Sequence, residues 1–175
     1  ETLGQPARVV DQPVPVPERG QARIRIAACG LNFADLLMAK GQYQEHPALP
    51  YIAGMEFAGV VDALGPDTSG PAIGTRVLTF AGSGGLTGSA CLPVDSLSPI
   101  PDSMSLPEAA AFPIAYGTSH LALAHRAQLQ AGETLLVFGA AGGVGLTAVE
   151  IGKRMGARVI AAASTQEKCD LCKKI

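Results

Sequence analysis

The first hundred residues alternate short apolar stretches with breaks rich in proline and glycine. Residues 21–30, QARIRIAACG, place Ile24 and Ile26 on one face and two arginines on the other, which is typical of a half-buried strand. Further strands are predicted by three stretches rich in apolar residues: 57–65, 74–80 and 89–94. Many short strands separated by such turns indicate a β-barrel or a β-sandwich.

One short helix interrupts these strands at residues 32–41, NFADLLMAKG. Asn32 is a favourable residue for capping its start, Asp35 stands at the third helical position, and Gly41 can end it. Both polar residues therefore have a structural explanation in the helix itself.

Longer helical patterns begin at Ser105. Ser105 followed three residues later by Glu108 is the signature of a capping box, so a helix should start there. After Pro113, the pattern predicts a second helix that continues through residues 116–128.

The last third of the chain has a strand–helix–strand pattern. Residues 133–139 and 157–163 are mostly apolar and flank a helical pattern at 143–154, which is typical of a βαβ unit with a buried parallel sheet. The expected buried face of this helix consists of Val144, Thr147, Ala148 and Ile151.

Composition and charge exclude several classes of function. With 175 residues, 47% of them apolar, and a net charge of −2, the chain has a core but no basic surface for nucleic acid. No apolar run is long enough to cross a membrane. The four scattered cysteines indicate a reduced, cytoplasmic protein, and Cys169 and Cys172 are interpreted as two helix residues one turn apart.

A glycine-rich segment, GAAGGVG at 139–145, joins the first of these apolar strands to the helix. Ala140, Gly142 and Gly145 occupy the three positions of the dinucleotide fingerprint, with alanine replacing the first glycine. Gly142 would admit a pyrophosphate, and Gly145 would let the helix pack on the strand. We expect the cofactor to contact this loop and the first helical turn: Ala140, Ala141, Gly142, Gly143, Val144 and Gly145.

The end of the second apolar strand indicates which dinucleotide binds. An NAD site usually has an acidic residue there, whereas residues 161–165 are alanines, Ser164 and a threonine. Ser164 and Lys168 suit the 2′-phosphate of NADPH, because it needs hydrogen-bond donors and positive charge. Alternatively, Lys168 is an ordinary solvated helix residue.

Four motifs follow one another along the chain: AACGLNFADLLMAKGQY, GMEFAGVVDALG, IGTRV and AAAFPIAYGTSHLALAHRAQLQAGETLLVFGAAGGVG. Together they resemble the medium-chain dehydrogenase/reductase superfamily, in its zinc-free quinone oxidoreductase (zeta-crystallin-like) branch. The resemblance implies an α/β protein with a GroES-like β-barrel domain at 1–112, followed at 113–175 by the first part of a Rossmann domain. It also implies NADPH as cofactor, quinones or α,β-unsaturated carbonyl compounds as substrates, and a homo-oligomer.

The resemblance also implies that no zinc is bound. Zinc-dependent relatives have a ligating histidine where this chain has Met55, and four cysteines in a lobe where it has only Cys91. His120 and His125 are five residues apart, so we expect them not to share a helical face, and His46 lies in a loop.

By the same resemblance, Asn32, Asp35 and Tyr43 lie near the nicotinamide and the substrate, and Thr118 lies beside the cofactor. Capping remains the alternative for Asn32 and Asp35, and helix packing for Thr118. Leu37 stands where many relatives have a further tyrosine, which leaves two functions open. One is an NADPH-dependent reductase of quinones, or of enones and 2-alkenals, and the other is a protein that binds NADPH without turnover.

The chain contains only the first crossover of a fold that uses about six strands. We therefore expect these 175 residues alone to bind NADPH weakly or not at all, and to show no turnover.

Overall fold

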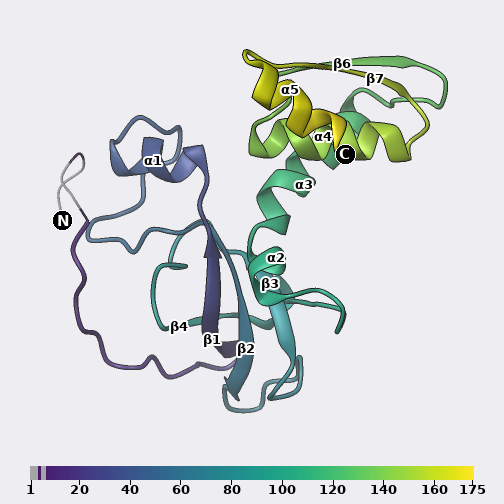
Figure 1. The fold of residues 1–175 in the computed structure, drawn as a ribbon. Helices are drawn as coiled ribbons and strands as arrows, with labels where there is room; N and C mark the ends of the chain where they lie inside the picture. The colour runs from purple at the N-terminus through teal and green to yellow at the C-terminus, as the bar shows by residue number, and fades with distance from the viewer. Residues whose placement is uncertain (1–3, 5–6) are drawn as a thin grey trace. The chain divides into compact units, whose positions relative to one another are not determined.

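A computed structural model describes Gly4 and residues 7–175, and the chain divides into two compact units, Glu1–Pro113 and Ile114–Ile175. Figure 1 shows the course of the chain through both. Each unit is described by itself below. Among the described residues, no helix has both the length and the apolar character that crossing a membrane requires.

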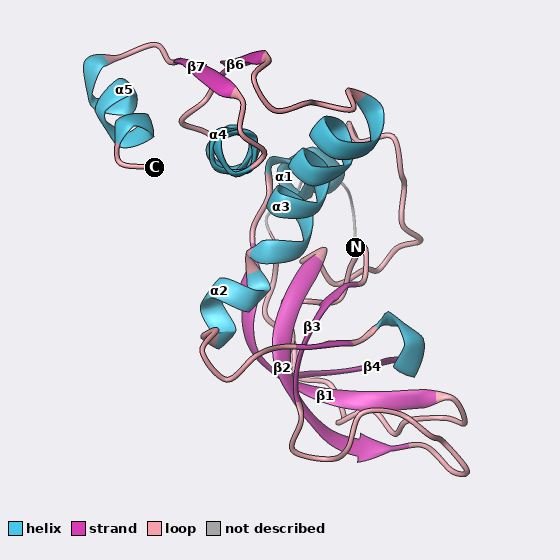
Figure 2. Ribbon diagram, turned by 90° about the vertical axis from the view of Figure 1, so that its right-hand side faces the viewer, coloured by secondary structure: helices cyan, strands magenta, loops and turns pink. Residues whose placement is uncertain are grey.

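The first unit is an antiparallel sheet with the strand order β4-β1-β2-β3-β5 (Figure 2). Its strands are β1 (Gln21–Gly30), β2 (Glu56–Leu64), β3 (Arg76–Phe80), β4 (Ser89–Pro93) and β5 (Ser98–Pro99). The four longer strands confirm those predicted from the pattern, whereas the two-residue β5 is too short to leave a periodic signal. Its short helices are α1 (Phe33–Ala39), the 3₁₀ turn η1 (Val94–Ser96) and α2 (Leu106–Ala110).

The alternation along β1 separates core from surface as expected. Ile24 is fully buried in a cluster with Val61 and Val77, and Ile26 packs against that cluster. On the other face, the Arg23 guanidinium forms a 2.7 Å ion pair with Asp62 on β2. The apolar cluster supplies most of the stabilisation, because burial of apolar surface outweighs a partly exposed ion pair.

The capping box at the start of α2 is present. The Ser105 backbone N–H donates to Glu108 Oε2 at 2.8 Å, and the Glu108 N–H donates to Ser105 Oγ at 3.3 Å. These bonds fix the first turn of α2, and Ala109 and Ala110 then pack against Ala58 of β2.

The second unit contains the predicted βαβ arrangement. Strands β6 (Thr134–Phe138) and β7 (Arg158–Ala162) pair in parallel, and α4 (Gly143–Arg154) connects them. Helix α5 (Gln166–Lys173) follows β7, and both helices lie on the same side of the strand pair (Figures 1 and 2). Cys172 is buried in this core, and all four cysteines are free thiols.

The predicted buried face of α4 is only partly correct. Thr147 is buried, but Val149 and Gly152 are buried too, and Val144 is 43% exposed. Two neighbouring elements explain the difference: Gly152 lies against Leu135 and Val159 of the sheet, whereas the Thr147 hydroxyl donates to the Ala115 carbonyl of helix α3 (Phe112–His120). The helix therefore buries two faces, which a single periodic stripe does not predict.

The two histidines contradict the sequence prediction. Helix α3 (Phe112–His120) continues into a π-helical segment, η2 (Leu121–Arg126), instead of remaining α-helical. A π-helix brings residues five apart together, so the rings of His120 and His125 have centroids 5.4 Å apart. Among residues 4 and 7–175, no group of three or more potential metal ligands is found.

Candidate functional site

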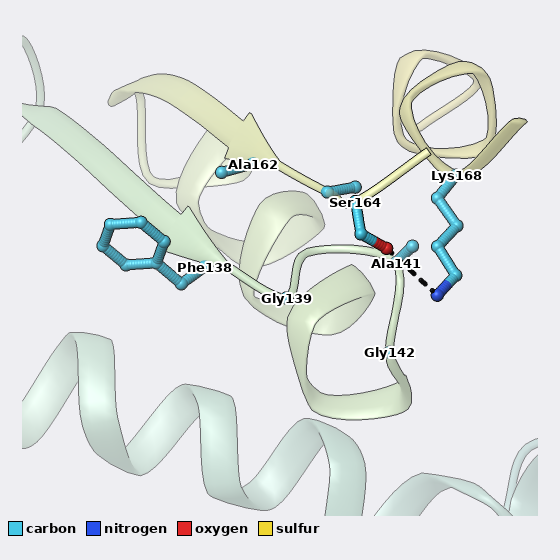
Figure 3. Close-up of a pocket in the computed structure, with 8 residues that line it drawn as sticks. Phe138, Gly139, Ala141, Gly142, Ala162, Ser164 and Lys168 are labelled. Atoms are coloured by element: carbon cyan, nitrogen blue, oxygen red, sulfur yellow. Dashed lines mark hydrogen bonds between the residues drawn. The ribbon is translucent and has the colours of Figure 1, made fainter. Parts of the chain in front are cut away.

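A groove of about 420 Å³ lies at the carboxyl ends of β6 and β7. This is the edge where ligands bind in open parallel α/β sheets. Figure 3 shows the groove between the glycine loop and the start of α5. It is lined by Phe138, Gly139, Ala141, Gly142, Ala162, Ala163, Ser164 and Lys168.

The structure brings Ala141, Gly142, Ser164 and Lys168 into this one groove. The Lys168 ammonium donates to Ser164 Oγ at 3.4 Å, and the Lys168 backbone N–H donates to Thr165 Oγ1, which caps α5. The cap places the lysine one turn after the serine. The groove thus has a cation and a hydroxyl on one wall, and no carboxylate among its lining residues.

The glycines of the loop have different roles. A Cβ atom at Gly145 would lie 2.7 Å from Ala140 Cα, so only glycine allows α4 to pack this closely on the loop. A Cβ atom at Gly142 would meet only the Gly139 carbonyl oxygen, at 3.4 Å, and would otherwise point into open space. Gly142 is also the N-cap of α4, so no side chain covers the positive end of that helix.

Other nominated residues lie outside the groove lining. Ala140 is fully buried in the core beneath the loop, with its N–H donating to the Ala162 carbonyl. Gly143, Val144 and Gly145 form the first turn of α4. Thr118 is exposed on α3, whereas its neighbour Ser119 is buried and donates to the Val144 carbonyl at 2.8 Å.

Phe138 and Gly139 line the groove but were not nominated from the sequence. The signal was present, because both lie at the carboxyl end of a strand predicted to be parallel. Phe138 is 80% exposed, which is unusual for the last residue of an apolar strand.

In the first unit, polar side chains gather where β1 leads into α1. The backbone N–H of Asn32 donates to Asp35 Oδ2 at 2.8 Å, and its side-chain Nδ2 donates to Glu56 Oε1 at 2.7 Å. Asp35 and Glu56 are both buried. The capping box of α1 is thus present: the Asp35 carboxylate accepts from the Asn32 N–H, and the Asn32 side chain accepts from the Asp35 N–H. Asn32 Nδ2 in addition reaches Glu56 on β2.

Two further residues, Cys29 and Tyr51, lie near these carboxylates. Burial, followed by the charges of Asp35 and Glu56, raises the pKa of the Cys29 thiol. Burial, with a smaller effect from Asp35, also raises the pKa of the Tyr51 hydroxyl, which was not nominated from the sequence. Tyr43 is partly buried after the turn that closes α1, where the Gln42 N–H donates to the Leu37 carbonyl.

Comparison with known proteins shows which family has this combination. The profile of the alcohol dehydrogenase GroES-like domain matches residues 18–102. A crystal structure of the quinone oxidoreductase from Thermus thermophilus, also solved in complex with NADPH, superposes with a TM-score of 0.88 at 42% identity. The match covers 98% of this chain and 54% of that one.

The chain belongs to the medium-chain dehydrogenase/reductase superfamily. Within it, the chain falls in the quinone oxidoreductase-like branch. It is 43% identical to the bovine (Bos taurus) quinone oxidoreductase-like protein 2 over 165 residues, which is 93% of this chain and 47% of the relative. The chain thus spans about half the length of the curated relatives it matches.

A second solved structure also has a bound dinucleotide. A mycobacterial protein complexed with NADPH superposes with a TM-score of 0.87 at 34% identity, covering 95% of this chain and 52% of that one. The chain thus has the GroES-like domain, followed by a short parallel sheet with helices, and matches an N-terminal part of the superfamily's fold.

Proposed function

We propose that the full-length protein is an NADPH-dependent, zinc-independent reductase that reduces a quinone by hydride transfer. The observation that supports this most is the groove at the ends of β6 and β7, which has Ser164 and Lys168 where an NAD site has an acid. Two relatives whose structures were solved in complex with NADPH independently support the same cofactor.

The residues of the groove fit a dinucleotide phosphate. Gly142 leaves open space at the start of α4, where a pyrophosphate would meet the positive end of the helix. The Lys168 ammonium and the Ser164 hydroxyl would bind the 2′-phosphate as charged and neutral donors. Bound NADPH supplies the hydride, which together with a proton from solvent converts a quinone to a hydroquinone and leaves NADP⁺.

Residues of the first unit would orient the electrophile. Asn32 has an amide held by Glu56, and Tyr43 carries a hydroxyl in a partly buried position. In this proposal both contact the substrate or the nicotinamide, and Asp35 keeps the start of α1 in place through its bond to the Asn32 N–H.

Steady-state oxidation of NADPH by the full-length protein tests the proposal. Turnover with quinones supports it. Turnover with enones or 2-alkenals but not with quinones would instead show that the protein is an enone reductase. Both chemistries use the same hydride transfer, so the substrate series rather than the cofactor separates them.

Binding of NADPH without turnover is the second candidate, and Leu37 favours it. This position in α1 carries a partly buried leucine, which offers no hydroxyl to a substrate carbonyl. Tight NADPH binding with no oxidation by any quinone or alkenal would support this candidate over a reductase.

The protein is further proposed to need no zinc. Met55 is buried directly before β2, and a thioether is a poor zinc ligand compared with imidazole or thiolate. We predict that protein purified without added metal contains no stoichiometric zinc by elemental analysis. One zinc per chain would contradict this.

A homo-oligomer in the cytoplasm completes the proposal. It is supported by superfamily membership and by the four free thiols, which suit a reducing compartment. Light scattering on the purified full-length protein would report a mass of two or four chains, and a monomer would contradict the oligomer.

A further inference from the structure

The Glu56 side chain occupies a space that the fold leaves open for it. Glu56 pairs with Gly30 on β1 and with Phe80 on β3, and it is only 2% exposed. A Cβ atom at Gly30 would lie 2.5 Å from Glu56 Oε1 and equally close to the Ala110 carbonyl. Glycine at position 30 thus makes room for a buried carboxyl group beside the end of β1.

The contact between Glu56 and Asn32 fixes one side-chain amide. Asn32 Nδ2 donates to Glu56 Oε1 at 2.7 Å, a short distance for a hydrogen bond from an amide nitrogen. A carboxylate oxygen only accepts hydrogen bonds, so the Asn32 amide must turn its NH₂ group toward Glu56. Its Oδ1 atom therefore faces away from Glu56.

The backbone of Asn32 is fixed separately. Its N–H donates to Asp35 Oδ2, and Asp35 is itself buried on α1. Asn32 is thus restrained at its backbone by one carboxylate and at its amide by another, although the residue remains partly exposed.

We propose that Glu56 is a positioning residue that sets the amide orientation of Asn32 and thereby decides which polar atoms Asn32 offers to a ligand. This inference rests on the proposed function, in which Asn32 lies at the reacting centre. In this proposal Glu56 itself contacts neither substrate nor cofactor, and it affects the ligand through Asn32.

Glu56→Gln is the variant that separates orientation from packing. Glutamine has nearly the same shape, but its amide can either accept from Asn32 Nδ2 or donate to Asn32 Oδ1. Glu56 then no longer imposes the orientation of the Asn32 amide, which is left to the weaker bond from the Asp35 N–H in the capping box. In the full-length protein, kcat/KM for quinone reduction should fall about tenfold.

The same substitution in an Asn32→Ala background tests whether Glu56 acts through Asn32. There, Glu56→Gln should cause no further loss, because nothing remains to be oriented. An equal loss in both backgrounds, or no loss in either, would overturn the proposal.

Thr79→Val serves as the matched control. Thr79 is a buried polar residue on β3 whose hydroxyl donates to the Ser96 carbonyl at 2.9 Å, so its loss weakens the same sheet without touching Asn32. It should lower the unfolding temperature and leave kcat/KM unchanged. If Thr79→Val also lowered kcat/KM tenfold, general destabilisation would explain the effect of Glu56→Gln, and the proposal would fail.

Nuclear magnetic resonance of the 175-residue chain gives a readout that needs no activity. The side-chain NH₂ group of Asn32 should show one proton with slow solvent exchange, and Glu56→Gln or Glu56→Asp should shift its resonance and speed that exchange. An Asn32 signal that is unchanged in both variants would overturn the inference. If the wild type fails to turn over while these shifts appear, the reductase assignment fails and the positioning contact stands.

Discussion

At the scale of single residues, the space available for an added methyl group differs between Gly143 and Gly145. Gly145 is enclosed by the backbone of residues 139–140, whereas a Cβ atom at Gly143 would have no neighbour within 4 Å. We predict that Gly145→Ala destabilises the fold by about 1–3 kcal/mol, because the added methyl group would meet backbone atoms that have no room to move.

Gly143→Ala is the control for this prediction. It adds the same methyl group to the same helical turn but into open space, and alanine favours a helix. Denaturant unfolding of both variants measures the difference, and equal stabilities would show that close packing at Gly145 is not what requires glycine.

The sequence predicted these glycine roles because the fingerprint has a local cause in the strand–loop–helix turn. It did not predict the bond between Asn32 and Glu56, since the two residues are 24 positions apart and meet only when β1 and β2 pair. For the same reason, Tyr51 near Asp35 was missed.

At the scale of elements, the capping box of α2 links stability to pH. Hydrogen bonds from the Ser105 hydroxyl and from its backbone N–H hold the pKa of Glu108 below its ordinary value. Because the pKa of Glu108 is lower in the folded state, these hydrogen bonds stabilise the fold at pH values above the pKa of an unfolded glutamate, about 4.3. This contribution is lost as the pH falls through the folded value.

We predict that Glu108→Gln lowers the unfolding temperature at pH 6 and that this difference shrinks as the pH falls toward 3. The reason is that glutamine can still cap but carries no charge to protonate. Removing the hydroxyl in Ser105→Ala should reduce the pH-dependent part, because only the backbone N–H of residue 105 then still donates to Glu108. A constant difference across this pH range would be inconsistent with a depressed Glu108 pKa.

The positions of helices and strands were predictable where the spacing of apolar residues reflects burial against a single neighbour. The prediction was wrong where a helix packs against two neighbours. Strands β6 and β7 and helix α4 match the predicted ranges closely, because each is a simple apolar run or stripe. The buried face of α4 depends on its contacts with α3 and with the sheet. The continuation of α3 as a π-helix has no signal in the local spacing of apolar residues. Local spacing contains no information about such contacts, so the meeting of His120 and His125 was missed.

At the scale of the whole molecule, the β6–β7 sheet is covered on one side only. Leu136, Phe138 and Ile160 are 43% to 80% exposed, while the residues between them pack on α4 and α5. A dinucleotide fold normally uses about six strands, with helices on both faces of the sheet.

We therefore predict that the 175-residue chain by itself binds NADPH weakly and shows no turnover. The chain spans only about half of the relatives it matches, and its two parallel strands are fewer than the six or so of a dinucleotide fold. Calorimetry with NADPH checks this, and tight binding of one NADPH per chain would show that the loop and a single crossover are sufficient.

The account depends most on the groove being a site for the 2′-phosphate of NADPH. The most direct measurement is the ratio of NADH to NADPH dissociation constants for the full-length protein, Lys168→Ala and Lys174→Ala. Lys174→Ala removes the same charge from the opposite end of α5, outside the groove. We predict that the wild type and Lys174→Ala prefer NADPH about tenfold or more, and that Lys168→Ala brings the ratio close to one. A ratio that Lys168→Ala leaves unchanged would contradict the account.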